Sequence, residues 1–106
     1  MAWHPVVEAE GLSDDEVVGV KIAGKDLAVC RAGGEYFALG NVCTHQFALL
    51  SDGVVEDGCI ECPIHQGRFD LRTGEPKGPP VTKPVVVYKV KVEDGRVMVE
   101  LDEGAS

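Results

Sequence analysis

Two short runs of the chain each bring a cysteine close to a histidine. The first reads NVCTHQFALL and holds Cys43 and His45, and the second reads CPIHQGRFD and holds Cys62 and His65. Sixteen residues lie between His45 and Cys62. Thiolate and imidazole groups are the usual protein ligands of zinc and of iron–sulfur centres. The repeated pairing therefore predicts a metal centre built from two segments.

The rest of the sequence predicts an all-β protein. Thirteen glycines and six prolines interrupt short valine-rich runs. No long segment keeps the apolar spacing of three and four that marks a helix. One helical turn, with Ser13 as its cap, is expected at residues 12–16. The expected strands are 3–8, 16–22, 26–32, 35–40, 54–56, 59–61, 85–92 and 97–101.

Tight turns are expected between several of these strands. Asp94-Gly95, Gly33-Gly34 and Asp57-Gly58 have the composition of two-residue hairpin turns. Residues 43–53 and 63–70 fall between strands, so we expect both segments to be loops. The hairpin between them can hold the two loops side by side.

Length, charge and the N-terminus restrict the class of protein. A chain of 106 residues that is 44% apolar can bury one core, so we expect a single domain over residues 1–106. Its net charge of −8, from 18 acidic and 10 basic residues, argues against nucleic-acid binding and favours basic protein partners. The N-terminal residues contain no apolar run long enough for a signal peptide or a membrane span. We therefore expect a cytoplasmic protein with no membrane partner, and we also expect a monomer.

Zinc held by two cysteines and two histidines is the nearest alternative to an iron centre. Paired ligands of zinc usually have roughly two to five residues between them, whereas one residue separates Cys43 from His45. Cys59 makes C-x-x-C with Cys62, but on a regular strand these positions face opposite sides. We expect Cys30 and Cys59 to be small core or sheet residues. A disulfide between them is not expected in a reducing cytoplasm.

A two-iron centre would give both thiolates to one iron and both imidazoles to the other. The pattern C-x-H, sixteen residues, C-x-x-H resembles the Rieske [2Fe-2S] motif. The resemblance is closest to the small Rieske ferredoxins of bacterial aromatic-ring-hydroxylating dioxygenase systems. It implies an antiparallel β-sandwich with a two-loop cluster-binding subdomain at about residues 41–80. The resemblance also covers Gly67, Phe69, Asp70, Thr73-Gly74 and Gly78-Pro79-Pro80.

The resemblance implies one [2Fe-2S] cluster and assigns its ligands. Cys43 and Cys62 would bind the inner iron, and His45 and His65 would bind the outer iron near the surface. Six further residues would shield the cluster or contact partners: Gln46, Phe47, Gln66, Gly67, Pro79 and Pro80.

Docking is expected at the tips of the cluster loops. Four acids on or beside the hairpin would form a charged rim behind the tips: Asp52, Glu56, Asp57 and Glu61.

Departures from the high-potential Rieske proteins of cytochrome complexes bear on the reduction potential. Those proteins carry an extra cysteine in each cluster loop, and Ile64 occupies the second-loop position here. They also place a serine and a tyrosine where this chain has Gly67 and Phe69. Fewer hydroxyl donors stabilise the added electron less. We therefore expect a potential toward the low end of the roughly −150 to +300 mV Rieske range.

The resemblance implies electron transfer rather than catalysis. The sequence has no nucleophile elbow, phosphate-binding loop, dinucleotide fingerprint or mononuclear-iron triad. We expect a soluble one-electron carrier, not an enzyme, between an NAD(P)H-dependent flavoprotein ferredoxin reductase and a terminal Rieske oxygenase of aromatic ring hydroxylation. Three alternatives stay open: the donor of another monooxygenase or demethylase system, a zinc-held Cys₂His₂ binding module, and an accessory protein resembling nitrite reductase small subunits.

Overall fold

A computed structural model describes residues 2–42, 48–63, 67–77 and 83–101. Strands and two short 3-10 helices make up the regular structure of these residues, and none of their helices has the length and hydrophobicity of a membrane span. The elements in chain order are β1 (Ala2–Glu8), η1 (Ala9–Gly11), β2 (Glu16–Ile22), β3 (Lys25–Ala32), β4 (Glu35–Gly40), η2 (Leu50–Asp52), β5 (Val54–Glu56), β6 (Cys59–Glu61), β7 (Arg68–Asp70), β8 (Val87–Tyr88), β9 (Val90–Glu93) and β10 (Arg96–Leu101).

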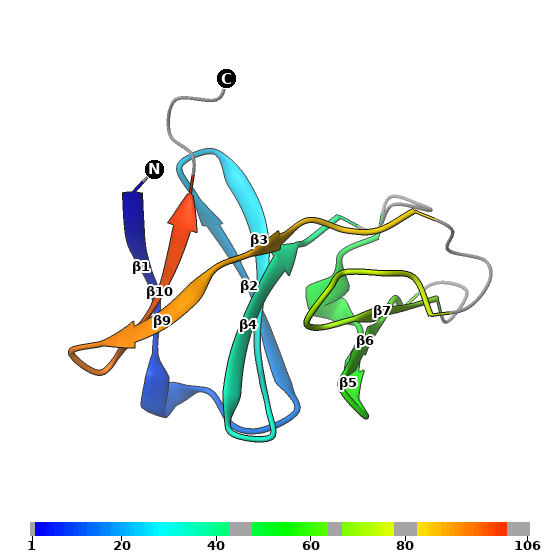
Figure 1. Cartoon of the computed structure of the whole chain (residues 1–106), viewed down its shortest axis with the longest axis horizontal. Helices are drawn as coiled ribbons and strands as arrows, with labels where there is room; N and C mark the ends of the chain where they lie inside the picture. Colours follow the sequence, from blue (N-terminus) through cyan, green and yellow to red (C-terminus); the bar gives the residue numbers. More distant parts are fainter. Residues whose placement is uncertain (1, 43–47, 64–66, 78–82, 102–106) are drawn as a thin grey trace.

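The described strands form three antiparallel sheets. Their strand orders are β1-β10-β9, β2-β3-β4-β8 and β5-β6-β7. Figure 1 shows the four-stranded sheet in the middle, with β1, β10 and β9 on one side and the small β5-β6-β7 sheet on the other. This arrangement confirms the expected all-β, antiparallel fold with a small separate subdomain.

Strand β3 of the middle sheet is buried on both faces. Along β3, Leu27 and Val29 pack into a core shared with β10, while Ala28 and Cys30 pack into a second core. Side chains alternate across a strand, so one strand can line two cores. The second core includes residues of the β5-β6-β7 sheet, among them Ile60. The apolar run LAVC in β3 is the sequence signature of this double burial.

Three predicted hairpin turns are confirmed. At Asp57-Gly58, for example, φ is 53° and 75°, the left-handed pair that a two-residue I′ turn requires. Gly33-Gly34 and Asp94-Gly95 have the same signs. A fourth turn of this kind, Ala23-Gly24, joins β2 to β3 and was not predicted, because alanine is an uncommon residue at positive φ.

The single strand expected at residues 85–92 is wrong. The structure has two strands there: β8 pairs with β4 in the middle sheet, and β9 pairs with β10 in the first sheet. The chain changes sheet at Lys89, whose carbonyl oxygen accepts a hydrogen bond from the Glu100 N–H at 3.0 Å. The valine-rich run is compatible with pairing in either sheet, so the sequence pattern did not show where the chain passes from one sheet to the other.

Two further local predictions are wrong. The loop expected at residues 63–70 ends in strand β7, which pairs with β6. The helical turn expected at residues 12–16 is a tight turn, in which Asp15 has a φ of 65° and the Glu16 N–H donates to the Ser13 carbonyl oxygen. Ser13 is not a side-chain cap: its N–H donates to Glu16 Oε1 at 2.9 Å. The nearest 3-10 helix is η1, directly before this turn.

Candidate metal centre

An isolated β-bridge flanks the first Cys/His segment. Val42 pairs with Leu49 in this bridge, and the Leu50 N–H donates to the Asn41 carbonyl oxygen at 2.7 Å. Cys43, His45, Gln46 and Phe47 fall between the two bridge residues and lie outside the described residues. The base of this loop is therefore a closed antiparallel pair at the end of β4.

The second segment starts and ends on neighbouring strands. Cys62 directly follows β6 and Gly67 directly precedes β7, and the Cys62 N–H donates to the Gly67 carbonyl oxygen at 2.7 Å. His65 and Gln66 fall between them, outside the described residues. The hydrogen bond extends the β6-β7 ladder by one rung, so this loop also has a closed base.

Cys62 is a member of the protein core. Its side chain is 2% exposed and packs in the same core as Ile60, Phe69 and Leu71. Within β6 the burial pattern places Ile60 inward and Cys59 on the partly exposed face, so Cys59 and Cys62 face opposite sides, as predicted. A charged thiolate in such an apolar site is stabilised when it pairs with a cation or binds a metal. This environment fits a cysteine ligand of iron and disfavours Cys59 as a second ligand of the same ion.

The connection between the two segments brings their bases together. The hairpin β5-β6 forms as predicted, with Val54 opposite Glu61. Gly53, just before β5, lies against the backbone of Glu61, where a Cβ atom on Gly53 would overlap the Glu61 carbonyl oxygen. Only glycine allows this approach without moving the chain that leads into Cys62.

A turn after β7 fixes the chain that leads to the proline segment. The Asp70 carboxylate accepts hydrogen bonds from the N–H groups of Arg72 at 2.8 Å and Thr73 at 3.1 Å. These two bonds, together with Lys77 Nζ at 3.7 Å, hold the pKa of Asp70 below its ordinary value, because all three favour the charged carboxylate. The Val85 N–H donates to the Gly74 carbonyl oxygen at 2.9 Å, which ties the far side of the segment to the same turn. Pro79 and Pro80 themselves lie outside the described residues.

The acids of the expected rim differ in their surroundings. Arg68 Nε lies 3.1 Å from Glu61 Oε1, and Arg68 Nη2 lies 3.5 Å from Glu56 Oε1. Within the described residues, no ion pair forms at Asp52 or Asp57. Two of the four charges on this side are therefore partly compensated.

The described part of the chain contains one predicted ligand, Cys62, and one predicted shielding residue, Gly67. No group of three or more metal-binding side chains occurs among the residues that the structure describes. Two residues were overlooked by the sequence analysis: Asn41 and Ser51, which bond to each other beside the Val42–Leu49 bridge. The available signal was a single amide side chain in the apolar stretch ALGNVC.

Comparison with known proteins identifies the family. Residues 2–92 match the Rieske [2Fe-2S] domain. The chain is 46% identical over 99 residues to the anthranilate 1,2-dioxygenase ferredoxin subunit of Burkholderia cepacia, covering 93% of this chain and 92% of the relative. It is 48% identical over 99 residues to the ferredoxin component of the naphthalene 1,2-dioxygenase system of Pseudomonas putida, covering 93% and 95%. The chain belongs to the Rieske [2Fe-2S] family.

A solved structure adds a likeness in three dimensions. The complex of reduced oxygenase and oxidized ferredoxin in carbazole 1,9a-dioxygenase contains a chain that matches with a TM-score of 0.87 and 36% identity, covering 94% of this chain and 97% of that one. Membership of the family confirms the expected cofactor, one [2Fe-2S] cluster. Both relatives are named as ferredoxins of dioxygenase systems and not as catalytic subunits. These names agree with the expected electron carrier and do not favour the three alternatives.

Proposed function

We propose that this chain carries single electrons from an NAD(P)H-dependent flavoprotein reductase to the terminal Rieske oxygenase of an aromatic-ring-hydroxylating system. The observation that carries the proposal is the family match over residues 2–92, which contains both Cys/His segments. The ferredoxin names of the relatives support the role, and the carbazole complex supports an oxygenase as the electron acceptor. The same proposal includes a monomer of one domain in the cytoplasm.

Four residues would hold the cluster in this proposal. Cys43 and Cys62 bind the inner iron, and His45 and His65 bind the outer iron. The burial of Cys62 at the closed base of its loop suits an inner-iron ligand. When bound, the [2Fe-2S] cluster supplies a one-electron redox couple.

Two described residues support a reduction potential near the low end of the Rieske range. Phe69 is fully buried beside Cys62 in the core and has no hydroxyl group to donate, and Gly67 has no side chain. These two positions therefore provide no side-chain hydroxyl that could donate a hydrogen bond to the reduced cluster. A low potential suits an electron donor to an oxygenase.

Partners would dock at the loop tips, where His45 and His65 give the shortest path to the outer iron. Gln46, Phe47, Gln66, Pro79 and Pro80 would form or flank this surface. Asp52 and Asp57 would steer a partner with basic edges, because Arg68 compensates part of the charge of the other two rim acids. The aromatic substrate is selected by the oxygenase, since the relatives serve systems named for different aromatic compounds.

Substitution of the ligands tests the proposal. The anaerobically purified protein should absorb visible light and, once reduced, give the electron paramagnetic resonance (EPR) spectrum of a cluster with mixed cysteine and histidine ligation. Cys62→Ser and His65→Ala should abolish both signals. Cys59→Ser is the matched control: Cys59 lies on the same strand run but on the other face, and the variant should keep both signals.

Two results would overturn the assignment. A colourless protein that contains one zinc per chain would identify the Cys₂His₂ module. Loss of the signals in Cys59→Ser with retention in Cys62→Ser would show that the ligand set is different. Reduction by a flavoprotein reductase, followed by transfer to a Rieske oxygenase in single turnover, completes the test of the carrier role.

A further inference from the structure

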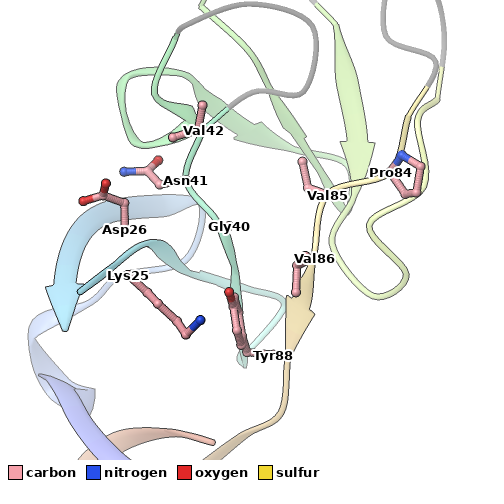
Figure 2. Close-up of a pocket in the computed structure, with 9 residues that line it drawn as sticks. All are labelled: Lys25, Asp26, Gly40, Asn41, Val42, Pro84, Val85, Val86 and Tyr88. Atoms are coloured by element: carbon pink, nitrogen blue, oxygen red, sulfur yellow. The ribbon is translucent and has the colours of Figure 1, made fainter. Parts of the chain in front are cut away.

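Asn41 is the one polar residue that is buried among the residues that the structure describes. It is 5% exposed and follows the last residue of β4. Figure 2 shows it beside Asp26, on the chain that runs from Gly40 to Val42. A buried amide is costly unless its polar atoms are bonded, so its partners are informative.

Every polar group of Asn41 is engaged in a hydrogen bond. Its N–H donates to the Asp26 carbonyl oxygen at 3.0 Å, and its carbonyl oxygen accepts from the Leu50 N–H at 2.7 Å. Its side-chain Nδ2 donates to Ser51 Oγ at 3.0 Å, while Oδ1 accepts from the Ser51 N–H at 2.8 Å. Asn41 thus joins β3 to η2, across the base of the segment that contains Cys43 and His45.

The Asn41–Ser51 pair packs closely against strand β2 of the middle sheet. A Cβ atom on Gly19 of β2 would lie 2.8 Å from Ser51 Oγ and 3.1 Å from Asn41 Nδ2. Cβ atoms do not approach other atoms as closely as 2.8 Å, and 3.1 Å is a tight contact, so a side chain at position 19 would require the Ser51 and Asn41 side chains to shift. The Asn41–Ser51 pair thus lies close to Gly19 of β2 and is hydrogen-bonded to the Asp26 carbonyl oxygen of β3.

We propose that Asn41 and Ser51 position the first cluster loop on the middle sheet and thereby set where Cys43 and His45 stand relative to Cys62. This inference rests on the proposed function, because it assumes that the loop binds the cluster. Asn41 lies two residues before Cys43, so a shift at Asn41 reaches the ligand across one intervening residue. Ligand groups must be held within about 0.5 Å of their productive geometry, which a fully satisfied polar pair achieves through directional bonds.

If the Asn41–Ser51 pair were only structural, it would stabilise the fold without affecting the cluster. A second hydrogen-bonded hydroxyl, in the core that contains neither loop base, serves as the control. The Tyr36 hydroxyl donates to the Ala9 carbonyl oxygen at 2.7 Å, also partly buried, but in the core shared with β10. Tyr36→Phe and Ser51→Ala each remove one such hydroxyl. Both should lower the melting temperature of the protein by a similar amount, since each removes one neutral hydrogen bond, which Tyr36 donates and Ser51 accepts.

The cluster should respond to only one of these two changes. We expect Ser51→Ala to release iron to a chelator roughly three- to tenfold faster than the wild type and to shift the EPR g-values, because the first loop loses one of its anchors. Tyr36→Phe should leave both unchanged. Gly19→Ala removes no hydrogen-bonding group but displaces the pair from below, so it should change the same two measurements in the same direction.

The outcomes separate this inference from the proposed function. If Ser51→Ala and Gly19→Ala release iron at the rate of Tyr36→Phe, with unchanged g-values, the pair is a stability contact and the inference is wrong. If the wild type itself holds no [2Fe-2S] cluster, the proposed function is what fails. Faster exchange of the Leu50 and Ser51 amide protons with solvent in Ser51→Ala would localise the loosening to the loop base, and unchanged exchange there would contradict the inference.

Discussion

Gly53 is the position where adding one methyl group should damage the metal centre most. In Gly53→Ala the new Cβ would overlap the Glu61 carbonyl oxygen and would also lie 3.0 Å from the Glu61 carbonyl carbon and 3.2 Å from the Leu50 carbonyl oxygen. All three atoms belong to the backbone, so the clash is relieved only by a backbone shift, at Gly53 or in the chain that leads into Cys62. Overpacking of this kind costs about 3 kcal/mol at the upper end of its usual range. For a domain of this size, that is a fall in melting temperature on the order of 15 °C.

Thermal unfolding and visible absorption measure the two consequences of Gly53→Ala. Gly11→Ala is the control, because the new Cβ there would have its nearest neighbour, Glu8 Cβ, at an ordinary 3.9 Å. We expect the control to melt within a few degrees of the wild type and to keep its full cluster content. Gly53→Ala should melt much lower and be purified with less iron. Equal melting temperatures and equal iron contents in the two variants would refute the reasoning that Gly53 allows an obligatory close approach.

Three further predictions concern charge and reactivity. Because the pKa of Asp70 is lowered in the folded state, its charge contributes stability that is present above the ordinary pKa of 3.8 and is lost as the pH falls through the lowered folded-state pKa. Asp70→Asn should therefore melt at a lower temperature than the wild type at pH 7. If this difference in melting temperature did not narrow in acid, the reasoning would be contradicted. Burial raises the pKa of the Cys30 thiol to about 12, so iodoacetamide at pH 8 should label Cys30 only after unfolding, and labelling of the native protein would show that Cys30 is accessible. Asp57→Lys should slow reduction by the reductase at low salt, with no change in potential and with the difference vanishing above about 0.5 M salt; equal rates at low salt would exclude steering by this residue.

The sequence predicted most strands because their signals are local. Alternating valines and two-residue turns such as Asp57-Gly58 determine a hairpin without reference to the rest of the chain. The errors arose where a distant partner decides the structure. β7 is three residues long and exists because β6 lies beside it, and the break at Lys89 exists because two different sheets compete for one run of valines.

The candidate site was predicted as a set of residue types but not as an architecture. The spacing of cysteine and histidine predicts the ligand chemistry, and the structure shows that Cys62 is buried in the core. The supports of the loops were missed because each is a contact between residues far apart in the sequence. Gly19 lies close to Ser51, and Gly74 lies close to Val85. Composition and periodicity do not reveal such contacts.

The two cores have different relations to the metal centre. The core that contains Cys62 also holds Cys30 and Leu39 from the middle sheet, so the base of the second loop shares one core with the sheet. The first loop reaches the same sheet through Asn41 and Asp26. Both loop bases are thus attached to the middle sheet. The sheet resists displacement because protein interiors are closely packed. The other core, with Val97 and Val99 of β10, stiffens that layer from its far face and has no residue in either loop base.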